Sequence, residues 1–259
     1  LLFFKNVFEW LMNHIVVINP NIGISNTDAY YSEESLDTIS NLIKTFDTGV
    51  SEIKTKQITV EEMSQMLPKE VLSEIFSTLK KQMQMTNLPE LKMTWRIADG
   101  FFNIRITGVG EPEITTLVLK HGKSVFDFSF DEESDGTKRL FDLIDMLMSK
   151  REDVAFVVDE LERSLHPKLT EHFLKLFMEA HETDRVQLVF TTHEDTIMDQ
   201  ELFRRDEIWF VEREETNASK IYSLDRFKER YDKKLSKAYL EGRYGAIPVF
   251  KQFTFRRHT

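Results

Sequence analysis

Apolar and polar positions alternate along the C-terminal part of the chain in a way that predicts strands separated by helices. Two short apolar runs, 154–158 and 186–191, have the length and the β-branched content of buried strands. Apolar residues recur at helical spacing in 137–148, before the first run, and in 168–180, between the two. Strands that alternate with helices form parallel sheets covered by helices. We therefore predict an α/β fold in which the strand 154–158 is buried on both faces.

The rest of the chain is predicted to add antiparallel strands and further helices. The clearest signal is a hairpin, in which 92–98 and 101–107 flank the turn Asp99-Gly100. Thr59 followed by Glu62 predicts a capping box at the start of a helix. The other expected elements of this part are helices at 3–11, 32–46, 59–66 and 68–83, strands at 15–18, 50–60, 113–121 and 124–130, and a turn at 19–21. A strand at 207–211 and a helix at 228–240 are expected to continue the alternating, parallel part of the fold.

Composition narrows the classes of protein to consider. The chain has 259 residues, is 41% apolar and carries a net charge of −10, which argues against a generally basic nucleic-acid-binding surface. It contains no cysteine, which excludes disulfides and thiolate chemistry and fits a cytoplasmic protein. No apolar run reaches the length of a membrane span. The start, Leu1-Leu2-Phe3-Phe4, resembles the interior of a longer chain and not a signal peptide.

Two adjacent carboxylates, Asp159 and Glu160, follow the apolar run 154–158 directly. Ligands of parallel sheets bind beyond the carboxyl ends of the strands, which is where these two residues are expected. A magnesium ion and an activated water would suit such a pair. A plain turn, with Asp159 as its cap and Glu160 in solvent, explains the same residues equally well at this point.

Two further motifs are expected near the same edge of the sheet. Ser134-Asp135-Gly136-Thr137 precedes the helix 137–148, and a helix N-terminus with small residues suits a phosphate, although a simple N-cap is the commoner use. His193 follows the strand 186–191 after Thr191-Thr192. A single histidine after a strand is usually an ordinary polar loop residue.

Taken together, the three motifs resemble those of ABC-class ATPases. In that class a Ser/Gly-rich signature precedes an apolar Walker B strand that ends in Asp-Glu, and a later strand ends in a switch histidine. A closer resemblance is to abortive-infection ATPases of phage-defence loci, the AbiL-like and RloA-like proteins and the ATPase of the PARIS system. It rests on Glu133–Thr137, on Asp159–Pro167 and on Tyr239–Pro248, and it is strong over residues 120–250.

The resemblance implies a role for each motif residue. Asp159 would hold Mg²⁺, Glu160 would polarise the attacking water and His193 would sense the γ-phosphate. Ser134, Gly136 and Thr137 would contact the γ-phosphate of an ATP held mainly by a second copy of the chain, so that ATP closes a head-to-tail dimer. The segment 164–167 would cross between the two sites. An effector nuclease or toxin is the partner implied by phage defence.

One motif of the family is missing from the sequence. A Walker A loop, Gly-x-x-x-x-Gly-Lys-Ser/Thr, must open a helix. The single Gly-Lys-Ser, at 122–124, has Leu117 where the first glycine should be and precedes an alternating, strand-like segment, so we reject it. We expect residues 1–89 to be the remainder of a helical insertion and residues 90–259 to be the C-terminal part of an ABC-type ATPase domain, with the Walker A half outside this chain.

Other interpretations remain open from the sequence. A metal-dependent hydrolase or nuclease could use Asp159, Glu160 and His193, with His166 and Asp195, as ligands. A DNA-repair ATPase of the chromosome-maintenance type and a scaffold that binds ATP without hydrolysis are the others. The basic residues of 226–237 and of the C-terminal tail are interpreted as solvated, with nucleic-acid binding left open.

Overall fold

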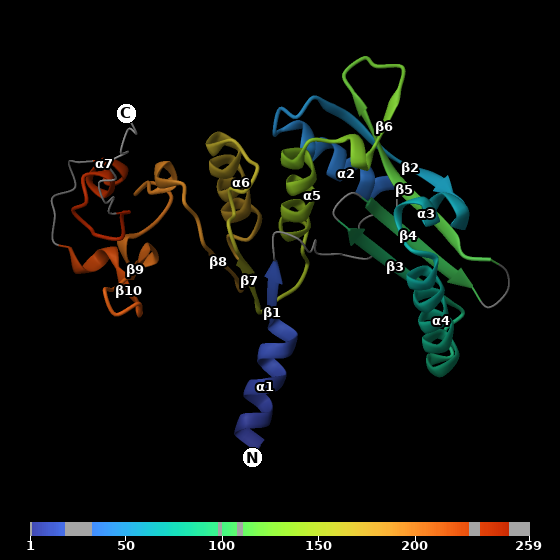
Figure 1. Ribbon diagram of the computed structural model, residues 1–259, viewed down its shortest axis with the longest axis horizontal. Helices are drawn as coiled ribbons and strands as arrows, with labels where there is room; N and C mark the ends of the chain where they lie inside the picture. Colours follow the sequence, from blue (N-terminus) through green and yellow to red (C-terminus); the bar gives the residue numbers. More distant parts are fainter. Residues whose placement is uncertain (1, 19–32, 98–99, 108–110, 228–233, 249–259) are drawn as a thin grey trace, which may run out of the picture. The chain divides into compact units, whose positions relative to one another are not determined.

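The computed structural model describes residues 2–18, 33–97, 100–107, 111–227 and 234–248. The chain forms two compact units, residues 1–192 and residues 193–259, each described here by itself. The first unit holds a parallel sheet and an antiparallel sheet with their helices, and the second holds a small antiparallel ribbon. The predicted α/β class is therefore confirmed, and the predicted turn at 19–21 lies outside the described residues (Figure 1).

The parallel sheet carries the apolar run that ends in the acidic pair. Its strands are β1 (Ile15–Ile18), β7 (Val154–Val158) and β8 (Val186–Phe190), in the order β1-β7-β8. Both strand pairs are parallel, and Val158 lies between Ile18 and Phe190. The connecting helices α5 (Asp135–Leu147) and α6 (Pro167–Ala180) confirm the predicted alternation. Because the strands are parallel and in register, their carboxyl ends meet at one edge.

The expectation that 154–158 is buried on both faces holds for only one face. Val154, Phe156 and Val158 are buried, and the ring of Phe156 contacts that of Phe177 on α6. On the other face Val157 is half-buried, and its neighbours Val17 and Val189 are 65% and 56% exposed. The two faces differ because α6 packs on the face of Phe156 and leaves the other side of these strands in contact with solvent.

The antiparallel sheet of the first unit has the order β2-β5-β4-β3, with β6 paired to β5. The hairpin of β3 and β4 is confirmed, although its turn residues 98–99 lie outside the described ranges. The strand predicted at 124–130 is too long, because Gly122–Phe126 form a turn region and a 3₁₀ turn begins at Phe130. The bounds of the strands are β2 Val50–Ile58, β3 Glu90–Ile97, β4 Gly100–Thr107, β5 Glu113–His121 and β6 Asp127–Ser129.

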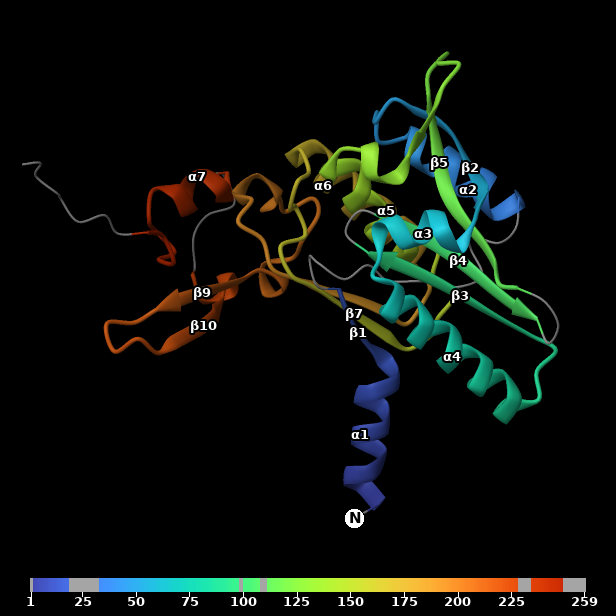
Figure 2. The same cartoon turned by 45° about the vertical axis from the view of Figure 1, so that its right-hand side comes forward.

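Helices cover both faces of this sheet. One core joins it to α2 (Glu33–Lys44) and α5 around Phe101, Phe130 and Phe141. A second core joins the opposite face to α3 (Val60–Met66) and α4 (Lys69–Thr86), so that α4 runs alongside β3 and β4 (Figure 2). The capping box of Thr59 and Glu62 is confirmed at the start of α3. Two adjacent residues of β4, Phe101 and Phe102, enter opposite cores, as the two-residue period of a strand requires.

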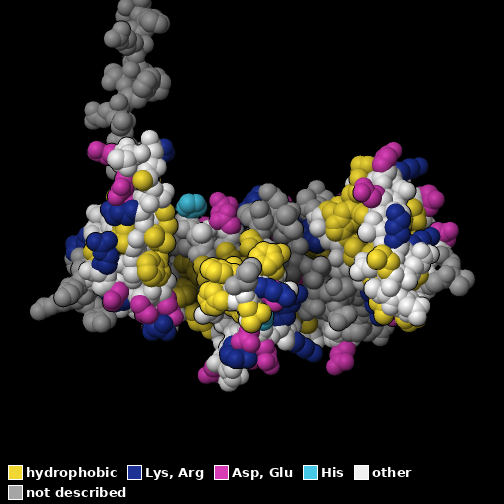
Figure 3. Space-filling model, turned by 90° about the horizontal axis from the view of Figure 1, so that it is seen from below, with side chains coloured by type: hydrophobic (Ala, Val, Ile, Leu, Met, Phe, Trp, Pro, Cys, Tyr) yellow, Lys and Arg dark blue, Asp and Glu magenta, His cyan; other side chains and the backbone are white. Residues whose placement is uncertain are grey.

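The first helix, α1 (Leu2–His14), has no buried residue. Large apolar side chains such as Phe3, Phe4 and Phe8 are 62–75% exposed. Figure 3 looks along this helix from below and shows hydrophobic side chains gathered there. Its last residue, His14, donates a hydrogen bond from Nδ1 to the carbonyl of Asp153 over 2.7 Å, which connects the end of α1 to the residue before β7.

The second unit corrects the prediction that 207–211 continues the parallel sheet. Strand β9 (Trp209–Arg213) pairs antiparallel with β10 (Ser219–Ser223), a strand that the sequence analysis missed. The core beneath this ribbon gathers aromatic rings of Phe210, Tyr222 and Tyr244. The helix predicted at 228–240 is described only as α7 (Leu235–Leu240), since 228–233 lie outside the described residues.

The division predicted between residues 1–89 and 90–259 stays a prediction. In the structure, β1 and β2 come from the first of these segments and pair with β7 and β5 of the second. In the ranges that the structure describes, each helix is too short or too polar to span a bilayer.

Packing of the first core can be tested with a matched pair of substitutions. Phe141 is 1% exposed, and Phe126, in the turn before β6, is 75% exposed. Phe141→Ala removes a buried ring and should lower the free energy of unfolding by about 3–5 kcal/mol, because it leaves a cavity. Phe126→Ala should change it by less than about 0.5 kcal/mol. The free energy of unfolding can be measured by urea unfolding monitored by circular dichroism. Equal losses for the two variants would contradict the burial of Phe141 in this core.

Candidate functional site

The acidic pair lies where the sequence predicts it, directly after β7. The amide of Asp159 donates to the carbonyl of Ile18 at the end of β1, over 3.3 Å. On the other side the amide of Thr191 donates to the carbonyl of Val158, over 3.0 Å. Asp159 is exposed and Glu160 is half-buried, so both carboxylates can reach a bound ligand. The turn is thus attached to both neighbouring strands of the parallel sheet.

Thr191 gives this turn a polar contact that the sequence analysis did not assign. Its hydroxyl donates to Asp159 Oδ1 over 2.5 Å and accepts from the amide of Glu160 over 2.9 Å. The carbonyl of Thr191 in turn accepts from the amide of Leu161 over 3.1 Å. The signal was available: in a parallel sheet, a hydroxyl that directly follows one strand lies beside the residue that directly follows its neighbour.

The backbone of the turn is held in a conformation that its residues do not favour. Glu160 has φ +47° and Ser164 has φ +61°, both in the left-handed region. For a non-glycine residue this conformation costs on the order of 1–3 kcal/mol and persists only where surrounding contacts impose it. At Glu160 two hydrogen bonds impose it: the amide of Glu160 donates to the hydroxyl of Thr191, and the carbonyl of Glu160 accepts from the amide of Arg163 over 3.1 Å.

The predicted signature residues form the first turn of α5. Ser134 is the N-cap, and its hydroxyl accepts from the amide of Thr137 over 3.2 Å. The hydroxyls of Ser134 and Thr137 lie 3.0 Å apart, with Ser134 exposed and Thr137 buried. Ser134 therefore presents the helix N-terminus to solvent, where an anion would meet backbone amides and the positive end of the helix dipole.

Gly136 brings this helix N-terminus against the turn that follows the acidic pair. A Cβ atom at Gly136 would lie 2.8 Å from the carbonyl oxygen of Ser164, closer than real Cβ contacts come. Only glycine therefore allows the first turn of α5 to approach the backbone of 160–164 this closely. This close approach places the predicted signature and the turn that follows the acidic pair in direct contact.

Arg139, one helical turn further along α5, reaches the acidic turn with its side chain. Its Nη2 donates to the carbonyls of Asp159 and Glu160 over 3.4 and 3.2 Å. Nη1 lies 3.9 Å from Asp142 Oδ2, and Asp142 Oδ1 lies 3.5 Å from Arg96 Nε of β3. All three side chains are at most 9% exposed. The sequence shows Arg139 only as a basic residue in a helix, so this contact could not be predicted from it.

Burial shapes the protonation of this charge cluster. It raises the pKa of Asp142, an effect that Arg96 and Arg139 only partly offset. It also lowers the pKa of Arg139, and the charge of Asp142 opposes that change. Both directions show that removal from water outweighs the attraction between the charges in this cluster.

His193 belongs to the second unit, where its side chain is exposed. It directly follows Thr192, the last residue of the first unit. Its predicted grouping with Asp159 and Glu160 stays a prediction.

The chemistry of Asp159 fits Mg²⁺. Magnesium is usually held by one or two carboxylates together with waters and substrate phosphates, and an exposed aspartate at a strand end provides such a ligand. Among the described residues, no three His, Asp or Glu side chains are grouped so that they could hold a metal ion by themselves.

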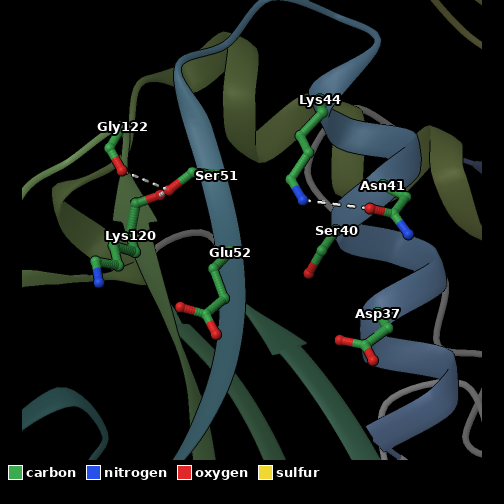
Figure 4. A pocket seen from close by; sticks show the side chains of 8 residues that line it. All are labelled: Asp37, Ser40, Asn41, Lys44, Ser51, Glu52, Lys120 and Gly122. Atoms are coloured by element: carbon green, nitrogen blue, oxygen red, sulfur yellow. Dashed lines mark hydrogen bonds between the residues drawn. The ribbon is translucent and has the colours of Figure 1, made fainter.

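The rejection of 122–124 as a Walker A loop is confirmed. Gly122 lies in the turn between β5 and β6 with φ +51°, and the next element is the strand β6 where a Walker A loop would open a helix. Gly122 also lines a polar pocket of about 340 Å³ between α2, β2 and β5 (Figure 4). There the hydroxyl of Ser51 donates to the carbonyls of Lys120 and Gly122. None of the predicted site residues lines this pocket.

Comparison with known proteins identifies one family. The model described as "AAA domain, putative AbiEii toxin, Type IV TA system" matches residues 27–199, more than half of the chain. The matched stretch contains the start of α5, the acidic turn and His193. No curated protein matches the chain.

The role of Thr191 in holding the turn can be measured with two substitutions. Thr191→Val keeps the shape of the side chain but removes both of its hydrogen bonds, and should lower the free energy of unfolding by about 1–2 kcal/mol. Thr191→Ser keeps the hydroxyl and should cost clearly less. Equal losses for the two variants in urea unfolding would show that the hydroxyl does not hold the turn.

Proposed function

The chain belongs to the AAA-domain family whose model spans residues 27–199, and we propose that it works as an ABC-type ATPase that binds ATP with Mg²⁺ and hydrolyses it. The observation that carries this proposal is the acidic turn. Asp159 and Glu160 follow a parallel strand, and hydrogen bonds to β1 and to Thr191, directly after β8, hold their main chain. Reactive groups that are fixed before the ligand arrives need little rearrangement during the reaction.

The two carboxylates have separate roles in this proposal. Asp159 is the residue that would hold Mg²⁺, which supplies positive charge to the phosphates when bound. Glu160 would orient a water and accept its proton; the hydrogen bond of its amide to Thr191 and the half-buried position of the residue support this role. Thr191 orients the carboxylate of Asp159 through its short hydrogen bond.

The N-terminus of α5 is the proposed phosphate contact of a second nucleotide. Ser134 is exposed there, while Gly136 and the buried Thr137 shape the helix start. On the resemblance to ABC-class ATPases, we propose that it meets an ATP held mainly by another copy, in a head-to-tail dimer. His193 would sense the γ-phosphate.

We further propose that this ATPase acts in phage defence. The match to a family described by an abortive-infection toxin supports it, as do the AbiL-like, RloA-like and PARIS-type motifs of Glu133–Thr137 and Asp159–Pro167. In this proposal, ATP-dependent dimerisation controls an effector nuclease or toxin in the cytoplasm. Residues 1–89 would serve as the helical arm.

Glu160→Gln tests this function directly. The amide keeps the size of the side chain but cannot accept the proton, so ATP turnover by the full-length protein should fall by about 10²–10⁴-fold. ATP binding and an ATP-dependent dimer, measured by sedimentation velocity, should persist or strengthen.

The matched control is Glu152→Gln, an exposed carboxylate just before β7, which should leave turnover unchanged. Undiminished turnover in Glu160→Gln would refute the assignment of Glu160 as the base.

A further inference from the structure

We propose that Arg139 is a positioning residue, whose guanidinium connects α5 to the carbonyls of Asp159 and Glu160 and thereby sets the orientation of Glu160. The inference rests on the proposed ATPase function and adds a residue that none of the motifs assigns. Three observations support this role: the contacts of Arg139, its burial and the backbone conformation of the acidic turn.

The contacts of Arg139 are with main-chain atoms of the acidic turn. One nitrogen, Nη2, lies within 3.4 Å of the carbonyl of Asp159 and 3.2 Å of that of Glu160. The amide of Glu160 is held by Thr191 on the opposite side, over 2.9 Å. Both peptide groups that flank Glu160 are therefore held by the same two residues: Arg139 of α5 contacts their carbonyls, and Thr191, directly after β8, accepts from their amides.

The buried side chain of Arg139 contributes little to the stability of the fold. Its side chain is 4% exposed, and among the described residues its Nε and Nη1 have no hydrogen-bond partner. The carboxylate of Asp142 lies 3.9 Å away and is shared with Arg96. A buried cation with unused donors contributes less to folding than an apolar side chain of the same size. Its contacts with the acidic turn are the favourable interaction that remains.

The contacts of α5 also connect the two motifs. Gly136 touches the backbone at Ser164, and Arg139 touches it at Asp159 and Glu160, so α5 contacts both ends of the turn. Glu160 is in the left-handed region at φ +47°. Without the guanidinium, the turn can relax toward a commoner conformation and carry the carboxylate of Glu160 with it. A ligand at Ser134 that shifts α5 would shift this turn as well.

The test compares Arg139→Met and Arg139→Lys with Phe141→Leu in the full-length protein. Methionine keeps much of the volume without the donors, and lysine keeps the charge without the planar fork. Phe141 is buried on the same helix but packs in the core between α2, α5 and the antiparallel sheet. It therefore controls for a loss of helix packing alone.

We expect both Arg139 variants to lower the kcat of ATP hydrolysis by about 10–100-fold per folded molecule, with the KM for ATP changed by less than about twofold. Phe141→Leu should lower the melting temperature while leaving kcat per folded molecule unchanged. Amide hydrogen exchange at 160–163 should accelerate in the Arg139 variants and not in Phe141→Leu.

Each other outcome overturns the inference. If kcat per folded molecule is unchanged, or if only KM rises, Arg139 does not orient Glu160. If neither Arg139 variant folds, the residue is structural. If the wild-type protein hydrolyses ATP and Glu160→Gln abolishes this activity, either of these results refutes only the positioning role of Arg139 and not the proposed function. If the wild-type protein shows no ATP turnover, the proposed function fails and the inference falls with it.

Discussion

The main chain of the Asp159–Glu160 turn is held from three sides, and the rest of the candidate site depends on that constraint. β1 accepts from the amide of Asp159, Thr191 holds the amide of Glu160 and Arg139 holds both carbonyls. These contacts stabilise a left-handed glutamate that would otherwise relax. A strained backbone fixed by its neighbours is typical of sites where a reactive group must keep one orientation.

The same constraint explains why polar groups are buried beneath α5. Arg96, Arg139 and Asp142 are removed from water, and burial raises the pKa of Asp142 despite two neighbouring cations. An apolar cluster in this place would stabilise the fold more. We interpret the buried charges through the contact of Arg139 with the acidic turn. The close approach at Gly136 brings α5 near enough for that contact. The start of α5 and the end of β7 therefore act as one structural element.

Local patterns predicted the elements well, and long-range contacts account for what was missed. The run 154–158 and the capping box of Thr59 are signals within a few residues, and both were confirmed. The pairing of β9 with β10 depends on which strands meet, which the apolar pattern of 207–211 does not encode. The contact of Arg139 joins residues 20 and 21 positions apart, and its function depends on burial that the sequence does not reveal.

The most direct test is a double-mutant cycle on kcat between Thr191→Val and Glu160→Gln in the full-length protein. If Thr191 acts by holding Glu160 in its catalytic orientation, Thr191→Val should lower kcat in the wild-type background. In the Glu160→Gln background its further effect should be much smaller, because only the contact of Thr191 with Asp159 remains to be lost. An equal loss of kcat in both backgrounds would contradict the central claim, because Thr191 and Glu160 would then act independently.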